Sequence, residues 1–197
     1  GLVLADVCDK GVGAALFMAL FRSLIRVFSG KAMLEGFVLP SQEISGEMLD
    51  TTDEMLQMTD FEHLKTLNAV KLTNNYIAVN HGDLSMFATM FFGVLNPNNG
   101  LLSYINGGHE PVVIISPQGG VRDYLSPTGP AVGVMPDVDY IIKQTVMAPG
   151  EIMLAYTDGV TEALSKDGKE FSRKRLLALL NKPPFSAKEL LENIAGQ

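Results

Sequence analysis

The first fifteen residues constrain the fold more than any other segment of this chain. An apolar run from Gly1 to Ala5 leads directly to Asp6, and Gly11 and Gly13 then open a long apolar pattern. This order predicts a buried strand that ends at an acidic side chain, followed by a turn and a helix. An acidic group at a strand tip usually holds a cation or a proton, so Asp6 is a candidate site residue.

A second segment repeats this arrangement far downstream. Residues 151–156 form another apolar strand pattern, and Asp158 and Gly159 follow it. Carboxylates are natural ligands for hard ions such as magnesium and manganese. Two such strand tips lying side by side would form a metal site.

Between these segments lies the turn Gly107-Gly-His109-Glu-Pro111. In this order the three blocks resemble the metal-dependent PP2C-like (PPM) serine/threonine phosphatases, in their bacterial SpoIIE/RsbU-like branch. The family pattern is Asp-Val-x-x-Lys-Gly-Val-x-Ala-Ala-Leu, then Gly-His-x-Pro, then Tyr-Thr-Asp-Gly-Val-x-Glu-Ala, and it is specific only in combination. The resemblance runs from Gly1 to about Leu180 and implies an α-β-β-α sandwich of two mostly antiparallel sheets, with the metal site at one edge.

Length and composition predict one domain, residues 1–197. A chain of 197 residues with 47% hydrophobic and 19% charged residues can bury a sizeable core. No segment reaches the roughly 18 uninterrupted apolar residues of a membrane helix, and Arg22 and Arg26 interrupt the longest apolar run, residues 14–28. We therefore expect no membrane contact by this domain.

Net charge and cysteine content limit which kinds of partner and which cellular compartment suit this chain. A net charge of -7 argues against nucleic acid, which is bound mostly through lysine and arginine. The single cysteine, Cys8, excludes an intramolecular disulfide, and the sequence shows no secretory signal. These features predict a cytoplasmic location, within a longer protein.

Periodicity predicts α+β organisation. Residues 1–6 read as a strand and 13–29 as a helix whose apolar positions are Leu16, Leu20, Leu24 and Val27 or Phe28. A helical segment at about 29–85 is expected to hold helices at 41–58 and 61–79, with Asp60 as an N-cap. Strands are predicted at 87–95, 101–105, 112–115, 121–125, 140–147 and 151–156, and helices near 172–180 and 186–194.

The resemblance implies specific roles at the matching positions. Asp6 would bridge two divalent cations, Mn²⁺ or Mg²⁺, and the backbone carbonyl of Val7 would help to hold one of them. Asp158 matches a second ligand, and Gly159 is small enough to let a hydrated ion approach. Such a site activates water for attack on phosphorus without a phosphoenzyme.

Four nearby residues have two interpretations each. Asp9 either caps the following helix or belongs to the site, and Lys10 is either a partial counter-charge or a phosphate contact. His109 either stabilises its turn or acts as a general acid. Glu162 is expected to orient Asp158 or a metal-bound water from outside the ligand sphere.

Other catalytic motifs do not match. Cys8 is not followed by the Cys-x5-Arg loop of cysteine phosphatases, because Ala14 stands where arginine belongs. The segment from Gly11 to Leu16 lacks the third glycine of a dinucleotide loop. Asp6 and Asp9 are one residue too far apart for a haloacid-dehalogenase-type phosphatase.

The chain departs from the family pattern at its ends, and two functions therefore stay open. Family members carry a Gly-Gly-Asp hairpin before the first block and an Asp-Asp-x-Thr-like motif after the last helices. Because this sequence lacks both segments, we expect a fold truncated at both ends. Because both segments supply carboxylate ligands, we also expect weak metal binding. One function is a phosphatase that acts on a phosphoprotein. The resemblance implies that this substrate is an anti-sigma-factor antagonist (anti-anti-sigma factor) of the STAS type, and that a sensor domain elsewhere in the parent chain controls the activity. The alternative is a non-catalytic binding module that has lost its metals.

Overall fold

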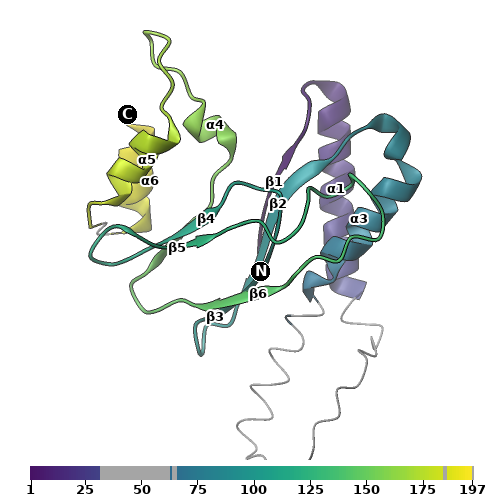
Figure 1. The fold of residues 1–197 in the computed structure, drawn as a ribbon, viewed down its shortest axis with the longest axis horizontal. Helices are drawn as coiled ribbons and strands as arrows, with labels where there is room; N and C mark the ends of the chain where they lie inside the picture. The colour runs from purple at the N-terminus through teal and green to yellow at the C-terminus, as the bar shows by residue number, and fades with distance from the viewer. Residues whose placement is uncertain (32–62, 64–65, 184–185, 197) are drawn as a thin grey trace, which may run out of the picture.

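The fold is a four-layer sandwich in which two sheets lie between two groups of helices (Figure 1). The computed structural model describes residues 1–31, 63, 66–183 and 186–196. Both sheets are antiparallel in their strand pairings. The predicted α+β class and the sandwich architecture are therefore confirmed.

The first sheet has the strand order β1-β2-β3-β6. Its strands are β1 (Leu2–Val7), β2 (Ala88–Leu95), β3 (Leu101–Gly107) and β6 (Lys143–Val146). The predicted hairpin between β2 and β3 is confirmed, and Gly100 in its turn has a φ of 74°. Among the described strands β1 pairs with β2 alone, so Asp6 lies at an edge of this sheet as described.

The second sheet has the order β5-β4-β7. Its strands are β4 (Val112–Ile115), β5 (Val121–Leu125) and β7 (Ile152–Leu154). Strands β6 and β7 are neighbours in sequence, but the turn at 148–150 carries the chain from the first sheet to the second. Asp6 and Asp158 are thereby delivered by different sheets.

Helices cover both outer faces. α1 (Val12–Lys31) and α3 (Ala69–Asn80) pack on the first sheet, and α5 (Arg173–Leu180) and α6 (Ala187–Ala195) pack on the second. Two short helices, η1 (Gly82–Leu84) and α4 (Asp158–Thr161), complete the order. α5 and α6 match the helices predicted near 172–180 and 186–194, and the side chains of Ser172 and Ser186 cap them. The predicted helix at 41–58 and the predicted cap Asp60 lie outside the described residues, and α3 matches the second half of the predicted helix at 61–79.

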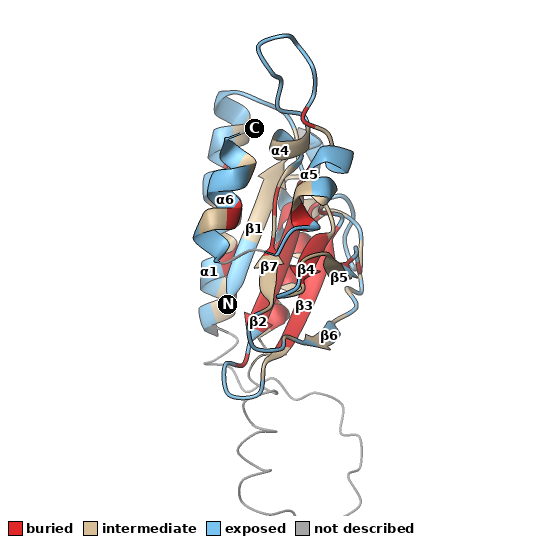
Figure 2. Cartoon of the chain, turned by 90° about the vertical axis from the view of Figure 1, so that its left-hand side faces the viewer, coloured by how far each residue is buried: buried red, intermediate tan, exposed pale blue. Residues whose placement is uncertain are grey.

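Alternating side chains of the central strands fill all three spaces between the layers (Figure 2). On β2, Met90 and Phe92 pack toward α1 and α3, whereas Phe91 packs toward the second sheet. On β4, Ile114 faces the first sheet and Ile115 faces α5 and α6. Both faces of these strands are buried, which explains why, apart from Thr89, their side chains are apolar.

The buried face of α1 coincides only in part with the predicted apolar positions. Phe17, Phe21 and Ile25 are buried against the first sheet, and the predicted Leu24 and Phe28 pack partly buried against the same core. Leu16 is 67% exposed, however. Both sets of residues recur at helical spacing, so periodicity alone could not choose the centre of the buried face.

By length and composition, residues 12–30 of α1 could cross a membrane. In the structure this helix packs on the first sheet through its buried face, and Arg22 and Arg26 are exposed. A core helix passes the same test, so α1 is weak evidence for a membrane span.

The packing of α1 predicts a difference between two neighbouring truncations. Phe21→Ala should lower the free energy of unfolding by about 3–5 kcal/mol, because it empties a fully buried site. Leu16→Ala, on the exposed side, should cost less than about 1 kcal/mol. Denaturant unfolding measures both, and a larger loss for Leu16→Ala would refute this assignment of the buried face.

Candidate functional site

Strand parity places Asp6 on the side of β1 that faces the second sheet. Ala5 and Val7 pack with the core beneath α1 and α3, so the side chain between them points the other way. Asp6 is half-buried and stands opposite Thr89 on β2. It therefore lies where the first sheet borders the space between the sheets.

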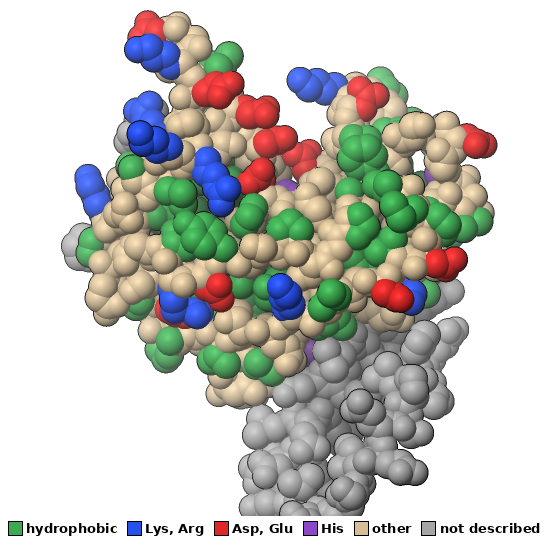
Figure 3. Space-filling model, viewed as in Figure 1, with side chains coloured by type: hydrophobic (Ala, Val, Ile, Leu, Met, Phe, Trp, Pro, Cys, Tyr) green, Lys and Arg blue, Asp and Glu red, His purple; other side chains and the backbone are tan. Residues whose placement is uncertain are grey.

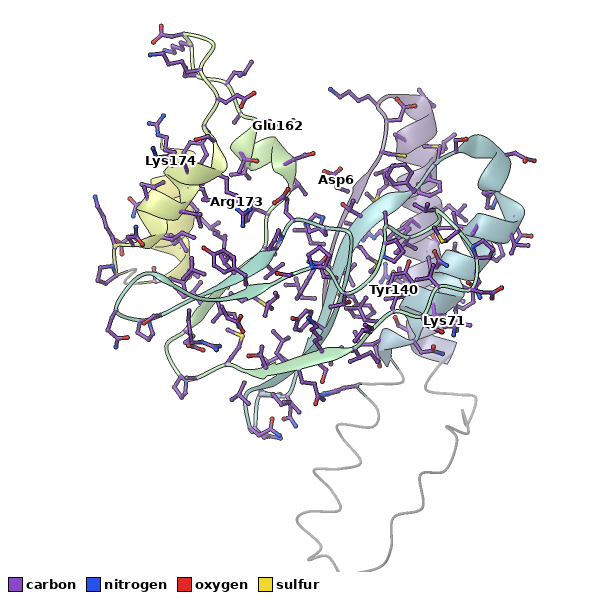
Figure 4. All side chains as sticks on the ribbon, viewed as in Figure 1. Asp6, Lys71, Tyr140, Glu162, Arg173 and Lys174 are labelled. Carbon is purple, nitrogen blue, oxygen red and sulfur yellow. The ribbon has the colours of Figure 1, made fainter. Side chains whose placement is uncertain are left out.

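Asp158 follows the second sheet. Leu154 ends β7, Tyr156 packs beneath α5 and α6, and Asp158 is the first residue of α4. Its side chain is exposed, at a helix start where backbone N–H groups favour a negative charge. Figure 4 shows Asp6 at the same end of the molecule as α4, where Glu162 is labelled.

His109 connects the two strand tips. Its side chain is only 3% exposed, and its Nδ1 lies 2.9 Å from the Thr89 hydroxyl oxygen, opposite Asp6 in the sheet register. Burial lowers the pKa of His109, against the opposing effects of Asp6, the Tyr156 carbonyl, Glu110 and Asp158. The structure thus brings Asp6, Asp158 and His109 into one electrostatic neighbourhood.

The glycines before His109 are required by packing. Gly108 has a φ of 65°, and a Cβ atom there would lie 2.9 Å from the backbone nitrogen of Ala131. A Cβ atom at Gly107 would lie 3.2 Å from the carbonyl oxygen of Pro130. The turn is closed by the backbone N–H of His109, which donates to the Asn106 side chain at 2.8 Å. These backbone contacts fix the turn that carries His109, and the choice between a structural and an acid role for its ring stays a prediction.

The two aspartates fit a hard divalent cation by their chemistry. Neither side chain makes a hydrogen bond or ion pair with the described residues, so their oxygens remain available. A Cβ atom at Gly159 would meet only the Thr157 hydroxyl, at 3.5 Å, so protein packing does not explain this glycine. Over the described ranges, however, no group of three or more His, Cys, Asp and Glu side chains could hold a metal.

Comparison with known sequences identifies the family. Residues 1–197 match the family model described as Stage II sporulation protein E (SpoIIE). The chain belongs to the SpoIIE family. The predicted resemblance to this family is therefore confirmed, and one solved structure of similar fold is the SiaA-PP2C domain of Pseudomonas aeruginosa, with a TM-score of 0.59 and 17% identity over 98% of this chain and 64% of that one.

Two curated relatives of this SpoIIE-family chain match nearly all of it. Protein IcfG from Synechocystis sp. (strain ATCC 27184 / PCC 6803 / Kazusa) is 48% identical over 196 residues, covering 100% of the chain and 30% of IcfG. Phosphoserine phosphatase RsbU from Bacillus subtilis (strain 168) is 28% identical, covering 98% of the chain and 48% of RsbU. The chain thus spans less than half the length of either relative.

A solved structure supports the fold. The RsbU and RsbW domains of Rv1364c from Mycobacterium tuberculosis match with a TM-score of 0.60 and 22% identity, over 90% of this chain and 40% of that one. At this identity the likeness concerns the fold alone.

The remaining site candidates of the SpoIIE-family motif lie around Asp6. Asp9 had two interpretations, a cap of the following helix or a residue of the site. Its Oδ1 accepts from the Lys10 backbone N–H at 2.7 Å, and α1 begins only at Val12, so Asp9 does not cap α1. With a φ of 76°, Asp9 shapes the turn before the helix, and its part in the site stays a prediction. Cys8 accepts at its sulfur from the Phe87 N–H, and Lys10 is exposed with no ion pair to a described carboxylate.

Glu162 is the C-cap residue of α4, directly after Thr161, and its backbone N–H donates to the Asp158 carbonyl at 2.8 Å. Its side chain is exposed and makes no hydrogen bond to the Asp158 carboxylate. An orienting role for Glu162 therefore stays a prediction.

Sequence reasoning missed two residues that hold the site together, Thr89 and Asn106. Thr89 bonds His109, and the Asn106 amide donates to the Leu125 carbonyl at 3.0 Å while its oxygen accepts from His109. Asn106 is fully buried. The available signal was an amide side chain at the end of an otherwise apolar strand run, where burial requires hydrogen-bond partners.

We predict that Asn106→Ala destabilises the domain by about 2–4 kcal/mol, because each buried group left without a partner costs about 1–3 kcal/mol. Asn98→Ala, in the exposed β2–β3 turn, should change stability by less than about 0.5 kcal/mol. Urea unfolding of both variants checks this pair. Equal stabilities would mean that Asn106 does not hold the turn.

Proposed function

We propose that this domain is a metal-dependent protein serine/threonine phosphatase. The observation that carries the proposal is the position of two carboxylates, Asp6 at the tip of an edge strand of one sheet and Asp158 just after a strand of the other, neither of which has a hydrogen bond or ion pair to a described residue. Membership of the SpoIIE family and similarity to a phosphoserine phosphatase support it.

Asp6, Asp158 and the Val7 carbonyl would hold Mn²⁺ or Mg²⁺, because hard cations prefer oxygen ligands. When bound, two such ions supply an activated water and offset the charge of the phosphoryl oxygens. The chain's own part is to fix these ligands: the sheet register places Asp6 beside Thr89, and α4 places Asp158. His109 holds the turn between them through Thr89 and Asn106, and its lowered pKa favours the neutral ring.

The substrate that we propose is phosphoserine or phosphothreonine on a regulatory protein, such as an anti-anti-sigma factor of the STAS type. The printed name of RsbU supports phosphoserine. Because the relatives extend well beyond this domain, a sensor domain elsewhere in the parent chain would control it, and we place this signalling function in the cytoplasm.

The second candidate is a non-catalytic binding module. It is favoured by the finding that no three-ligand metal group occurs among the described residues. Hydrolysis of a phosphoserine peptide by the full-length protein, with and without manganese, separates the two functions. Manganese-dependent release of phosphate supports the phosphatase, and its absence supports the binding module.

Asp158→Asn should abolish manganese-dependent hydrolysis in the full-length protein while leaving the fold intact. The change removes an anionic ligand but almost no volume, and even partners outside the ligand sphere cost about 10- to 100-fold. We therefore expect a loss of more than about 100-fold, measured as phosphate release at saturating manganese.

Asp167→Asn is the matched control, because Asp167 is equally exposed but lies in the loop between α4 and α5. It should retain full activity. Thermal unfolding without metal should be nearly unchanged for Asp158→Asn. Retained turnover in Asp158→Asn would refute the assignment of the site, and a large loss of stability would make Asp158 structural.

A further inference from the structure

The start of α5 is unfavourable for a helix considered alone. Its first three residues are Arg173, Lys174 and Arg175, and its first turn holds no acidic residue. Cations at this end of a helix are repelled by the unpaired N–H groups. The preceding Ser172 has φ 66° and ψ 149°, a conformation that is costly for any residue with a side chain. Local helix stability therefore does not explain this basic segment.

The Arg173 side chain is positioned by two tyrosines. Its guanidinium carbon lies 5.8 Å from the centre of the Tyr124 ring, a cation–π distance. Burial raises the pKa of Tyr156, and the nearby charge of Arg173 acts in the opposite direction. Tyr156 is buried, and the Arg173 side chain, besides its charge, acts on the tyrosine hydroxyl as a hydrogen-bonding neighbour that lowers its pKa.

The charge of Arg173 is not neutralised by the protein. No carboxylate of the described residues lies within 4.0 Å of its guanidinium. In a protein with net charge -7, an exposed arginine without an acidic partner is available to an anion from outside.

Arg173 lies beside the candidate metal site. Tyr156, which it approaches, is two residues before Asp158. Figure 4 shows Arg173 on the side of α5 that faces α4 and the Asp6 strand tip, whereas Lys174 lies on the outer side of the helix. In Figure 3, Lys and Arg side chains border a row of acidic side chains on this face. A group bound between the aspartates would have Arg173 at its side.

We propose that Arg173 binds an anionic oxygen group of the phosphoprotein substrate and is a specificity-determining residue of this site. The inference rests on the proposed phosphatase function. The group is either a carboxylate next to the phosphorylated residue or the phosphoryl group itself, since both present oxygens that match the guanidinium fork. Tyr124 holds the guanidinium in place before the substrate arrives.

Arg173→Gln tests the proposal in the full-length protein with manganese. Two phosphoserine peptides serve as substrates, one with acidic and one with neutral neighbouring residues. We expect KM for the acidic peptide to rise by about 10-fold or more, the size of one charge-assisted contact, with a smaller change in kcat. If KM rises for the acidic peptide alone, Arg173 binds the neighbouring carboxylate; if it rises for both, Arg173 binds the phosphoryl group.

Lys174→Gln is the matched control, because it removes the same charge from the same helical turn on the outer side. It should leave KM for both peptides close to the wild-type value. Arg173→Lys should give an intermediate KM, because it keeps the charge and loses the planar fork. An unchanged KM in Arg173→Gln, or an equal rise in Lys174→Gln, would overturn the proposal.

Failure of the proposed phosphatase function can be told apart from failure of the Arg173 proposal. If the wild-type protein with manganese hydrolyses neither peptide, the phosphatase assignment fails, and binding decides the role of Arg173. The affinity for a fluorescent acidic phosphoserine peptide should then fall about 10-fold in Arg173→Gln and stay unchanged in Lys174→Gln. Equal affinities for all three proteins would refute Arg173 as an anion-binding residue.

Discussion

One buried amide group, that of Asn106, joins the parts of the molecule on which the candidate site depends. Asn106 belongs to β3 of the first sheet, its amide donates to the carbonyl of Leu125 in β5 of the second sheet, and its oxygen accepts from His109. Its backbone carbonyl accepts from the N–H of Thr128 at 2.7 Å. A fully satisfied buried amide specifies one arrangement of its partners, because any other leaves polar groups unpaired. The relation of the two sheets and the position of the His109 turn are therefore fixed together.

The same logic extends to the helices on the first sheet. The buried Asn74 side chain of α3 accepts from the Gly133 N–H and donates to the Met135 carbonyl, both at 2.9 Å. Tyr140, labelled in Figure 4, donates to Asn74 and packs against Gly129, where a Cβ atom would lie 2.5 Å from its ring. Residues 128–140 thus contact α3 on one side and the glycines before His109 on the other. The exposed Lys71–Asp139 ion pair adds little to this connection.

The sequence was informative wherever a local rule and the tertiary structure agree. The strands that lead to Asp6 and Asp158, the paired strands β2 and β3, and the helices α5 and α6 follow from patterns within a few residues. It failed where the choice depends on distant partners. Leu16 and Phe17 obey the same periodicity, and only the sheet beneath decides between them. Asn74, Thr89 and Asn106 look like ordinary polar residues until the fold supplies their partners, and Arg173 gains meaning only from the two tyrosines beside it.

The passage of the chain between sheets at residues 148–150 has a mechanical consequence for the site. Because Asp6 belongs to one sheet and Asp158 follows the other, their relative position depends on the packing of an apolar layer that includes Phe91, Leu102 and Ile114. Close-packed apolar side chains are nearly incompressible. Unlike exposed ion pairs, their packing does not weaken as the ionic strength rises. The relative position of these two carboxylates therefore depends on hydrophobic packing, and a methyl group added or removed between the sheets would change it.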